Sequence, residues 1–285
     1  MGAAGRDGGN SAAAQLASAD LQIHSSLSDG TASPAAIVRY ASEQTDLDLI
    51  AITDHDDFRG AEAAREAAAG TNARVEVVPG IELTTRSGHL LALWIDGPIA
   101  PFQSLERTLE SIQRAGGLAV VPHPLGLLTL SLGTRSIERA LRSEASRAVL
   151  VGLELANPTP AARQRQASAR RANRDWHLAE TGGSDAHFLE FIGSARTVFA
   201  RGAPADASGA LRAALLARTT VAEQRAAPSL REIGPRRLLA QQWHGLSATP
   251  RIAVAGSVAG PLAARAARGW RSARQRAHAT VAGRL

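Results

Sequence analysis

Five of the eight histidines lie in short polar clusters beside carboxylates, and each cluster adjoins an apolar run. In chain order the clusters read QIHSSLSDG (22–30), TDHD (53–56), GIE with GHLL (80–82 and 88–91), PHP (122–124) and GGSDAH (182–187). Imidazoles and carboxylates hold Zn, Mn or Fe in proteins, and the chain has no cysteine to supply a thiolate. The spacing therefore predicts a site for several metal ions, provided that the fold gathers the clusters at one place.

Local sequence makes several of these side chains candidate ligands. His24 lies five residues before Asp29, which sits in a Ser-Asp-Gly turn. His55 ends an apolar run where a charged group is costly unless it is paired or bound to a metal. His123 stands between two prolines, which fix the backbone around a ligand.

The remaining candidates are a carboxylate, a histidine and a closely spaced pair. Glu82 follows Pro79-Gly80 at an expected strand end, where a carboxylate can bridge two cations. Asp185 and His187 are two residues apart, so in an extended chain both point to the same side. His89 opens an apolar strand, and a buried structural histidine is the alternative there. Three histidines lie outside the pattern and are expected to be structural or exposed: His177, His244 and His278.

The elements that must position these residues are strands alternating with helices. Apolar runs at 47–53, 75–78, 89–95, 118–121, 149–155 and 177–181 predict strands, and amphipathic segments at 34–44, 60–69, 101–115, 136–144 and 160–174 predict helices. The clusters recur about every 30 residues, the length of one βα unit, and the longest gap leaves room for an extra strand or loop. This order favours an α/β barrel with a parallel sheet, whose functional residues lie at the carboxyl ends of the strands.

Charge and composition divide the chain into three parts. Residues 1–18 are expected to form a disordered tail, 19–222 the barrel, and 223–285 an arginine-rich extension. The extension holds eleven arginines against two glutamates, a balance of +9, whereas the rest of the chain has a balance of −3. The extension could be a solvated tail, a nucleic-acid contact or a contact to an anionic surface. No secretory signal or membrane-spanning run is visible, so a cytoplasmic location is expected.

The order HxxxxD, TDH, GIE, GHLL, HP and SDAH resembles the PHP (polymerase and histidinol phosphatase) superfamily over residues 20–200. The resemblance implies a distorted, TIM-like (β/α)7 barrel with two or three divalent ions, Mn, Zn or Fe, that hydrolyses phosphoesters. The basic extension after this barrel would be mostly helical or disordered.

The resemblance also implies a role for each ligand. One ion would be held by Asp29, His55 and His187, a second by Glu82, His89 and His123, and a third by His24 and Asp185 with Glu82 as the bridge. Acting through bound metal and water, the catalytic residues would be His55, Glu82 and Asp185.

One position departs from the family's pattern. Gln22 stands where the family usually has the first histidine of a His-x-His motif. A glutamine carbonyl can ligate a hard cation but binds Zn more weakly than imidazole does. Gln22 is therefore an additional candidate ligand, and the third ion is expected to be weak, exchangeable or absent.

The expected function is metal-dependent hydrolysis of a phosphate ester, in which a metal-bound water attacks the phosphorus in line. The substrate would be a phosphorylated small molecule, a nucleotide or an oligonucleotide end. Arg135 could bind a substrate phosphate bidentately, with a solvated surface arginine as the alternative. The alternative function is a non-catalytic PHP-like module that binds nucleic acid or an anionic surface through its basic tail. Gln22 favours this alternative, and the retained Glu82, Asp185 and His187 oppose it.

Overall fold

The computed structural model describes residues 15–126, 129–201 and 206–243. Its elements in chain order are β1 (Leu16–Ile23), α1 (Pro34–Gln44), β2 (Leu49–Ile52), α2 (Arg59–Thr71), β3 (Glu76–Thr85), β4 (Gly88–Leu93), α3 (Leu105–Arg114), β5 (Leu118–Val121), α4 (Thr134–Leu141), α5 (Glu144–Val149), β6 (Leu150–Ala156), α6 (Pro160–Arg163), α7 (Gln166–Trp176), β7 (Ala179–Gly182), the 3₁₀ turn η1 (Leu189–Phe191), β8 (Ala195–Ala200), α8 (Ala207–Ala217), β9 (Val221–Gln224) and α9 (Leu230–Ile233). Residues 235–243 are also helical.

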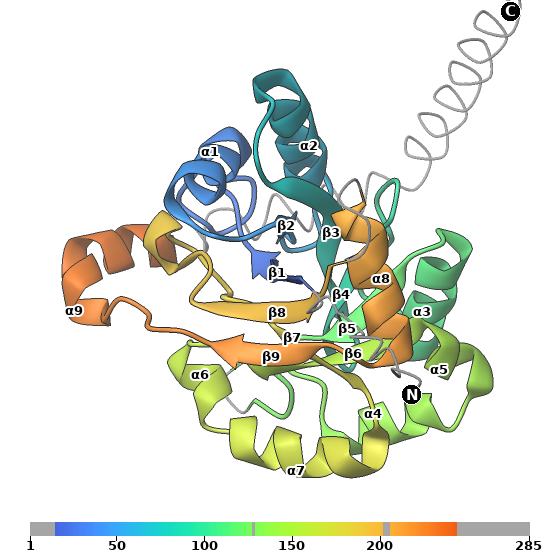
Figure 1. The fold of residues 1–285 in the computed structure, drawn as a ribbon. Coiled ribbons are helices and arrows are strands. Elements are labelled where there is room, and N and C mark those ends of the chain that lie inside the picture. Colours follow the sequence, from blue (N-terminus) through green and yellow to red (C-terminus); the bar gives the residue numbers. More distant parts are fainter. Residues whose placement is uncertain (1–14, 127–128, 202–205, 244–285) are drawn as a thin grey trace, which may run out of the picture.

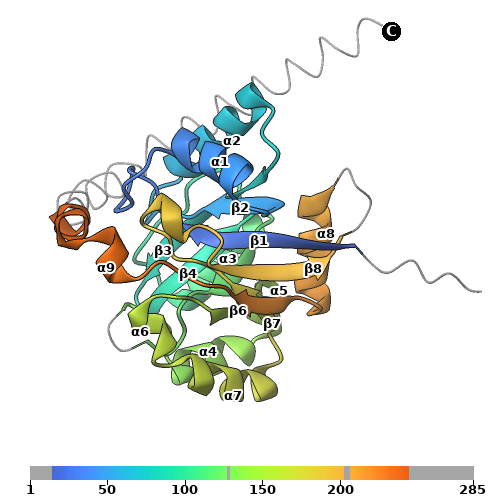
Figure 2. The ribbon, with the colours of Figure 1, turned by 60° about the vertical axis from the view of Figure 1, so that its left-hand side comes forward.

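All of these strands form one sheet in the order β7-β6-β5-β4-β3-β2-β1-β8-β9. The sheet curls into a barrel with helices on its outside (Figures 1 and 2). Its two ends approach each other where Thr197 Oγ1 in β8 accepts a hydrogen bond from Gly182 N in β7, over 3.0 Å. Thr220 Oγ1, just before β9, also donates to Glu180 O in β7 over 2.7 Å. The fold is therefore a mixed α/β barrel whose sheet is nearly closed.

The sheet is mixed, whereas the sequence pattern predicted a parallel one. Strands β1, β2 and β3 run parallel, as do β5, β6 and β7, but β4 is antiparallel to both of its neighbours. Strand β4 follows β3 directly, since Thr85 pairs with Gly88 across a two-residue turn that leaves no room for a crossover helix. It occupies the longest gap between clusters, where an extra strand or loop was expected.

The expected limits of the barrel shift at both ends. Strand β1 begins at Leu16, so residues 16–18 belong to the sheet and not to a tail. Strand β9 pairs with β8 from Ala195↔Gln224 to Val198↔Val221, so the sheet extends two residues past the expected boundary at 222. The sequence pattern also missed β8 and α8. The tail residues 1–14 and the extension from 244 onward lie outside the described residues.

Helix starts follow the local capping chemistry. Ser33 Oγ accepts the backbone N–H of Ala36 over 3.3 Å, and Pro34 opens α1 as predicted. Ser104 caps α3 in the same way, through the N–H of Arg107. The segment 160–174, expected as one helix, divides into α6 and α7.

Apolar side chains pack in three buried clusters that hold the helices on the sheet. One lies under α1 and α2 and includes Ile37 and Ile52. A second lies under α3, α4 and α7 and includes Trp176. A third joins strand residues to α8. Helix α8 also contacts the amino ends of strands, because Ser208 N donates to Glu76 and Arg212 donates to Gly116 O. It therefore closes the end of the barrel opposite to the polar clusters.

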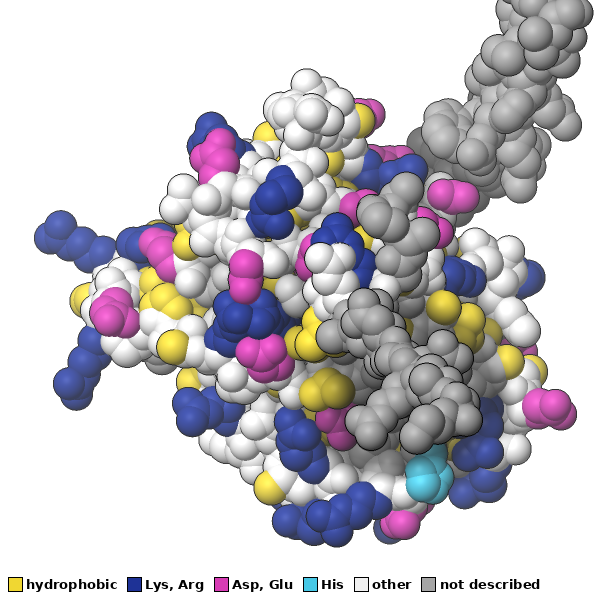
Figure 3. Space-filling view, in the orientation of Figure 1, with side chains coloured by type: hydrophobic (Ala, Val, Ile, Leu, Met, Phe, Trp, Pro, Cys, Tyr) yellow, Lys and Arg dark blue, Asp and Glu magenta, His cyan; other side chains and the backbone are white. Residues whose placement is uncertain are grey.

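On the face shown in Figure 3, arginine and acidic side chains are interspersed. No helix in the described part of the chain has both the length and the hydropathy required to cross a membrane.

Candidate metal centre

The strand ends bring the predicted polar clusters together. His24 follows β1, His55 follows β2, His123 follows β5, and Asp185 and His187 follow β7. Backbone hydrogen bonds fix the loops to one another, as from His24 N to Ala186 O over 3.0 Å and from Asp56 N to Glu82 O over 2.9 Å. Side chains that are far apart in sequence therefore converge at the carboxyl end of the barrel.

Glu82 is the centre of this cluster. It is fully buried, and four imidazoles approach its carboxylate. Its Oε1 lies 2.8 Å from His89 Nδ1 and 3.0 Å from His123 Nε2, and its Oε2 lies 3.2 Å from His24 Nε2 and 3.8 Å from His55 Nδ1. Gln22 Nε2 also donates to Oε2 over 3.0 Å. One carboxylate thus contacts His89 and His123 through one oxygen and His24 and His55 through the other.

Asp29 and Asp185 complete the cluster on the side of His24. His187 Nε2 lies 2.9 Å from Asp29 Oδ2, and His24 Nδ1 lies 3.5 Å from Asp29 Oδ1. His24 Nε2 lies 3.2 Å from Asp185 Oδ1. The five imidazole rings form a continuous series, 187–24–55–89–123, with neighbouring centroids 4.6 to 5.6 Å apart.

Burial and charge move the pKa values of these groups in opposite directions. Burial lowers the pKa of His55 to about 4, so this imidazole is neutral at pH 7. Burial alone would also lower the pKa of His123, but its hydrogen bond to Glu82 and the charge of that carboxylate raise it to about 9. The pKa of His24 is raised well above its usual value, despite burial, by Asp185, Asp29 and Glu82.

The carboxylates remain ionised in this setting. Burial opposes ionisation of Glu82, yet the surrounding histidines hold its pKa well below its ordinary range. His24 and His187 likewise lower the pKa of Asp185 to about 2 against the effect of burial. Without a metal, protons on the histidines therefore compensate the buried negative charge.

The donor set fits divalent metal ions. Three groups of ligand atoms each lie within 4.8 Å of one another: His24, His55 and Glu82; His24, Asp29 and His187; and Glu82, His89 and His123. Among the described residues, Gln22 Oε1 is a buried side-chain atom without a hydrogen-bond partner, and the ring nitrogens of His24 and His89 Nδ1 face carboxylates without forming well-aligned hydrogen bonds. Buried polar atoms left unpaired are costly, and a cation among them would remove that cost.

The ligand groups differ in part from the expected assignment. Glu82, His89 and His123 form one group, as assigned from the resemblance. Asp29 and His187 are grouped with His24, and His55 is grouped with His24 and Glu82, although its ring lies 3.8 Å from both Asp29 and Glu82. The ion held by each residue stays a prediction.

Two local expectations need correction. Glu82 was expected at a strand end, but β3 continues to Thr85 and Glu82 pairs with Leu91 inside the β3–β4 ladder. Asp185 and His187 were expected on an extended chain, but Asp185 has φ +53°, in the left-handed region. The two side chains still face the same cluster, with His187 Nδ1 4.0 Å from Asp185 Oδ1.

Four carboxylates that were not among the predicted site residues surround the candidate ligands: Asp20, Asp54 and Glu154 are buried, and Asp56 is partly buried. Asp54 accepts hydrogen bonds from Ser25 N and Ser28 Oγ in the loop that carries Asp29. Asp56 accepts one from Thr84 N, two residues after Glu82. Asp20 and Glu154 make similar bonds to other loops. A charged residue inside an otherwise apolar run, as at 20 and 154, was the available signal.

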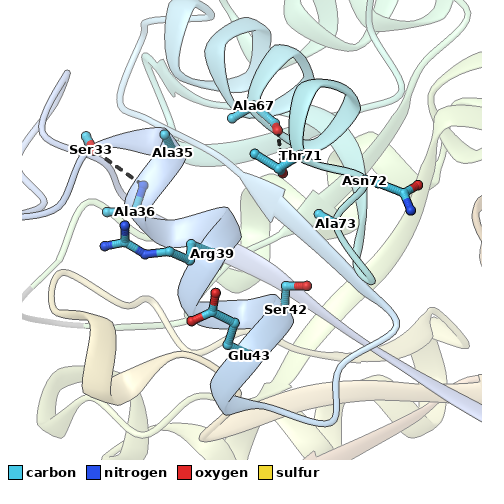
Figure 4. Close-up of a pocket in the computed structure, with 10 residues that line it drawn as sticks. All are labelled: Ser33, Ala35, Ala36, Arg39, Ser42, Glu43, Ala67, Thr71, Asn72 and Ala73. Atoms are coloured by element: carbon cyan, nitrogen blue, oxygen red, sulfur yellow. Dashed lines mark hydrogen bonds between the residues drawn. The ribbon is translucent and has the colours of Figure 1, made fainter.

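Arg135 and a surface hollow lie outside this cluster. The Arg135 side chain is exposed on the first turn of α4, and its substrate role stays a prediction. The hollow lies on the outer surface against α1 and α2 (Figure 4). Two of its hydroxyl groups, Ser33 Oγ and Thr71 Oγ1, are already bonded to backbone atoms of Ala36 and Ala67. The histidine cluster is therefore the candidate functional site.

The fold and the cluster together define an α/β barrel with a candidate multinuclear metal centre at the carboxyl ends of its strands. Two family models match this chain: the PHP domain over residues 20–160 and the PHP-associated region over residues 165–220. The chain belongs to the PHP superfamily.

Sequence relatives cover parts of the chain. The uncharacterized protein MJ1587 of Methanocaldococcus jannaschii is 33% identical over 128 residues, which are 41% of this chain and 73% of that protein. The 5'-3' exoribonuclease Rnm of Escherichia coli is 35% identical over 81 residues, which are 27% of each protein. The exoribonuclease match thus spans about a quarter of that enzyme's length.

Two solved structures share the fold. One is a two-domain protein from Bacteroides vulgatus that contains a predicted PHP-like metal-dependent phosphoesterase. It is 19% identical with a TM-score of 0.61, and the match covers 74% of this chain and 65% of that one. The other is PsfC from Pseudomonas syringae, 17% identical with a TM-score of 0.57, covering 81% of this chain and 98% of that one. At these identities the likeness concerns the fold alone.

Proposed function

We propose that this chain is a metal-dependent phosphoesterase with a di- or trinuclear centre at the histidine cluster. The observation that carries the proposal is Glu82, a buried carboxylate between 2.8 and 3.8 Å from nitrogens of four histidines. Two or three divalent ions bound there would polarise phosphoryl oxygens and lower the pKa of a coordinated water toward neutral. A nitrogen and oxygen donor set without thiolates suits Mn, Zn or Fe.

Exposure of the ligands indicates where a substrate would enter. Side chains of Asp29, His55 and His187 are 23, 24 and 22% exposed, whereas Glu82 is 1% and His24 is 0% exposed. The edge formed by Asp29, His55 and His187 therefore faces solvent, and a substrate phosphate would approach there. The buried Glu82 and the partly buried Asp185 hold negative charge behind it and orient the imidazoles.

The proposed substrate carries a phosphate ester at an accessible end, either in a phosphorylated small molecule or at the end of a nucleotide or oligonucleotide. The likeness of one segment to a 5'-3' exoribonuclease supports including the oligonucleotide end. His55, Glu82 and Asp185 are the proposed catalytic residues, and Arg135 is a proposed contact to substrate phosphate.

The test combines ion content with a substrate series. Purified chain loaded with manganese is analysed for bound ions and assayed with a phosphomonoester, a phosphodiester and a 5'-phosphorylated oligoribonucleotide. We expect at least two ions per chain and turnover of one substrate class that His55→Ala lowers by about 100-fold or more. Less than one ion per chain, or equal turnover in the variant, would contradict the proposal.

A second candidate is a non-catalytic module that binds nucleic acid or an anionic surface through its extension. The hydrogen bond from Gln22 to Glu82 favours it, because an amide occupies a ligand position. Residues 244–285 contain seven arginines and no acidic residue. Deleting residues 244–285 leaves β9 intact. This candidate predicts that the truncated chain loses binding to an oligonucleotide or to anionic vesicles. It also predicts that the full chain shows no manganese-dependent turnover.

A further inference from the structure

Two buried carboxylates, Asp20 and Glu154, belong to none of the three ligand groups. They are 0 and 3% exposed, which is unusual for acids without an arginine partner. Each lies on a strand next to a loop that carries candidate ligands. The hydrogen bonds of each carboxylate indicate its role.

Glu154 holds the backbone of His123. Its Oε2 accepts hydrogen bonds from His123 N over 2.7 Å and from Asn157 Nδ2 over 2.8 Å. His123 has φ +29°, a left-handed conformation that is strained for a residue with a side chain. In this conformation its ring presents Nε2 to Glu82 Oε1 over 3.0 Å. The bond to Glu154 therefore fixes the direction in which the ring points.

Asp20 holds the loop of Asp185 and His187 in a comparable way. Its Oδ1 accepts from Ser184 N over 2.9 Å, and its Oδ2 accepts from Gly193 N over 2.8 Å. The segment between these two N–H groups contains both candidate ligands, and Asp185 itself has φ +53°. One carboxylate therefore pins both ends of a ligand-bearing segment to β1.

We propose that Glu154 and Asp20 are positioning residues that each hold one half of the metal centre: Glu154 the half of Glu82, His89 and His123, and Asp20 the half of Asp29, Asp185 and His187. This inference rests on the proposed function. Hydrogen-bond partners behind metal ligands fix the ligand orientation, and their loss weakens metal binding by about 10–100-fold.

Glu154 accepts hydrogen bonds with one oxygen, whereas Asp20 accepts them with both, so amide substitutions are expected to have different effects at the two positions. Glu154 accepts both of its bonds with one oxygen, so Glu154→Gln keeps an acceptor for His123 N–H. Asp20 uses both oxygens, so Asp20→Asn turns one acceptor into an N–H₂ group that faces a backbone N–H. The conservative variant is expected to rescue function at position 154 and to fail at position 20.

Manganese binding measured by calorimetry tests the proposal in wild type, Glu154→Leu, Glu154→Gln and Asp20→Asn. We expect Glu154→Leu and Asp20→Asn each to weaken binding of one ion by about 10-fold or more, and Glu154→Gln to bind within about threefold of wild type. Asp48→Leu is the control, because Asp48 also accepts a backbone N–H, from Ser18 over 2.9 Å, but at the opposite end of β2 from His55. This substitution also removes an ion pair with Arg201, so it tests whether loss of a structural carboxylate away from the cluster weakens metal binding. Thermal unfolding without metal shows whether each variant folds.

Double variants assign each carboxylate to its half. Glu154→Leu should cause no further loss in a His123→Ala background and its full loss in a His187→Ala background, and Asp20→Asn should show the reverse. Equal losses in both backgrounds, or losses matched by Asp48→Leu, would overturn the inference. Wild type without bound manganese would overturn the proposed function as well, whereas manganese-loaded wild type with unaffected variants would overturn the inference alone.

Discussion

The side-chain amide of Gln22 donates a hydrogen bond from Nε2 to Oε2 of Glu82, 3.0 Å away in the buried centre of the cluster. The same oxygen lies 3.2 Å from His24 Nε2, and Gln22 Oε1 is buried without a hydrogen-bond partner in the described structure. An amide thus contacts the carboxylate oxygen that would join His24 and Asp185 at an ion.

Gln22→His should strengthen ion binding beside His24 and Asp185. Imidazole is a better zinc ligand than an amide oxygen, and a neutral imidazole can leave its lone pair free for the ion. We expect about one more zinc ion retained per chain after dialysis, measured by elemental analysis. Gln22→Leu, which removes both amide atoms, is the control and should retain no additional zinc. Equal zinc content in wild type and Gln22→His would mean that residue 22 does not limit the site.

His55→Ala should strongly reduce turnover without unfolding the barrel. The His55 ring is half-buried at the solvent-facing edge of the cluster, and burial lowers its pKa to about 4, which leaves a neutral nitrogen for a cation. His177→Ala is the control, because His177 is exposed at the end of α7. The hydrolysis rate should fall by about 100-fold or more in the first variant and stay unchanged in the second. Equal rates for the two would remove His55 from the proposed chemistry.

Stabilisation by manganese should grow between pH 6.5 and pH 8.5. In the metal-free fold, Glu82 raises the pKa of His123 from 6.5 to about 9, so the stability from its bound proton is complete below pH 6.5 and is lost as the pH rises through 9. Burial raises the pKa of Glu154 to about 8, which acts in the same direction. Metal binding requires neutral His123, so a rising pH favours the loaded protein.

Thermal unfolding with chelator and with excess manganese, across this pH range, measures the effect. At a free manganese concentration 100 times Kd the ion adds about 2.7 kcal/mol to the free energy of unfolding. A shift in Tm that shrinks as the pH rises would contradict the protonation scheme.

Gly183→Ala should destabilise the protein and weaken metal binding. A Cβ at this position would overlap Glu154 Oε1 and lie 2.8 Å from Gln22 Cβ, both buried near the cluster. Overpacking of this kind costs about 1–3 kcal/mol. Gly70→Ala is the control, since its Cβ would meet nothing within 4 Å and alanine favours the helix. Chemical denaturation should separate the two; equal unfolding free energies would show that the centre accommodates the methyl group.

Residue types and apolar runs were sufficient to predict much of the fold and the cluster. Histidines and acids directly after apolar runs indicated His24, His55 and His123 because parallel strands bring their carboxyl ends together. The amphipathic segment at 34–44 predicted α1 with its observed bounds. These signals are local, so one sequence is enough to read them.

Other features depend on the path of the loops and were not readable. The left-handed φ of Asp185 and His123 sets the direction of their side chains in the cluster. Neither residue type predicts a positive φ from sequence. Strand β4 is antiparallel because of a two-residue turn, which apolar periodicity does not resolve. Asp20 and Glu154 stand out as acids inside apolar runs, but the sequence does not show which backbone N–H groups they bind.

The hydrogen bond between His187 and Asp29 joins residues 158 positions apart, because the curled sheet returns β7 to the side of β1 and β8. A growing chain therefore presents its first ligands long before their partners have been synthesised. The half formed by Glu82, His89 and His123 is complete much earlier. The Asp29 group therefore depends on contacts between the first and the last strands that surround the cluster, whereas the Glu82, His89 and His123 group spans only residues 82–123 of the chain.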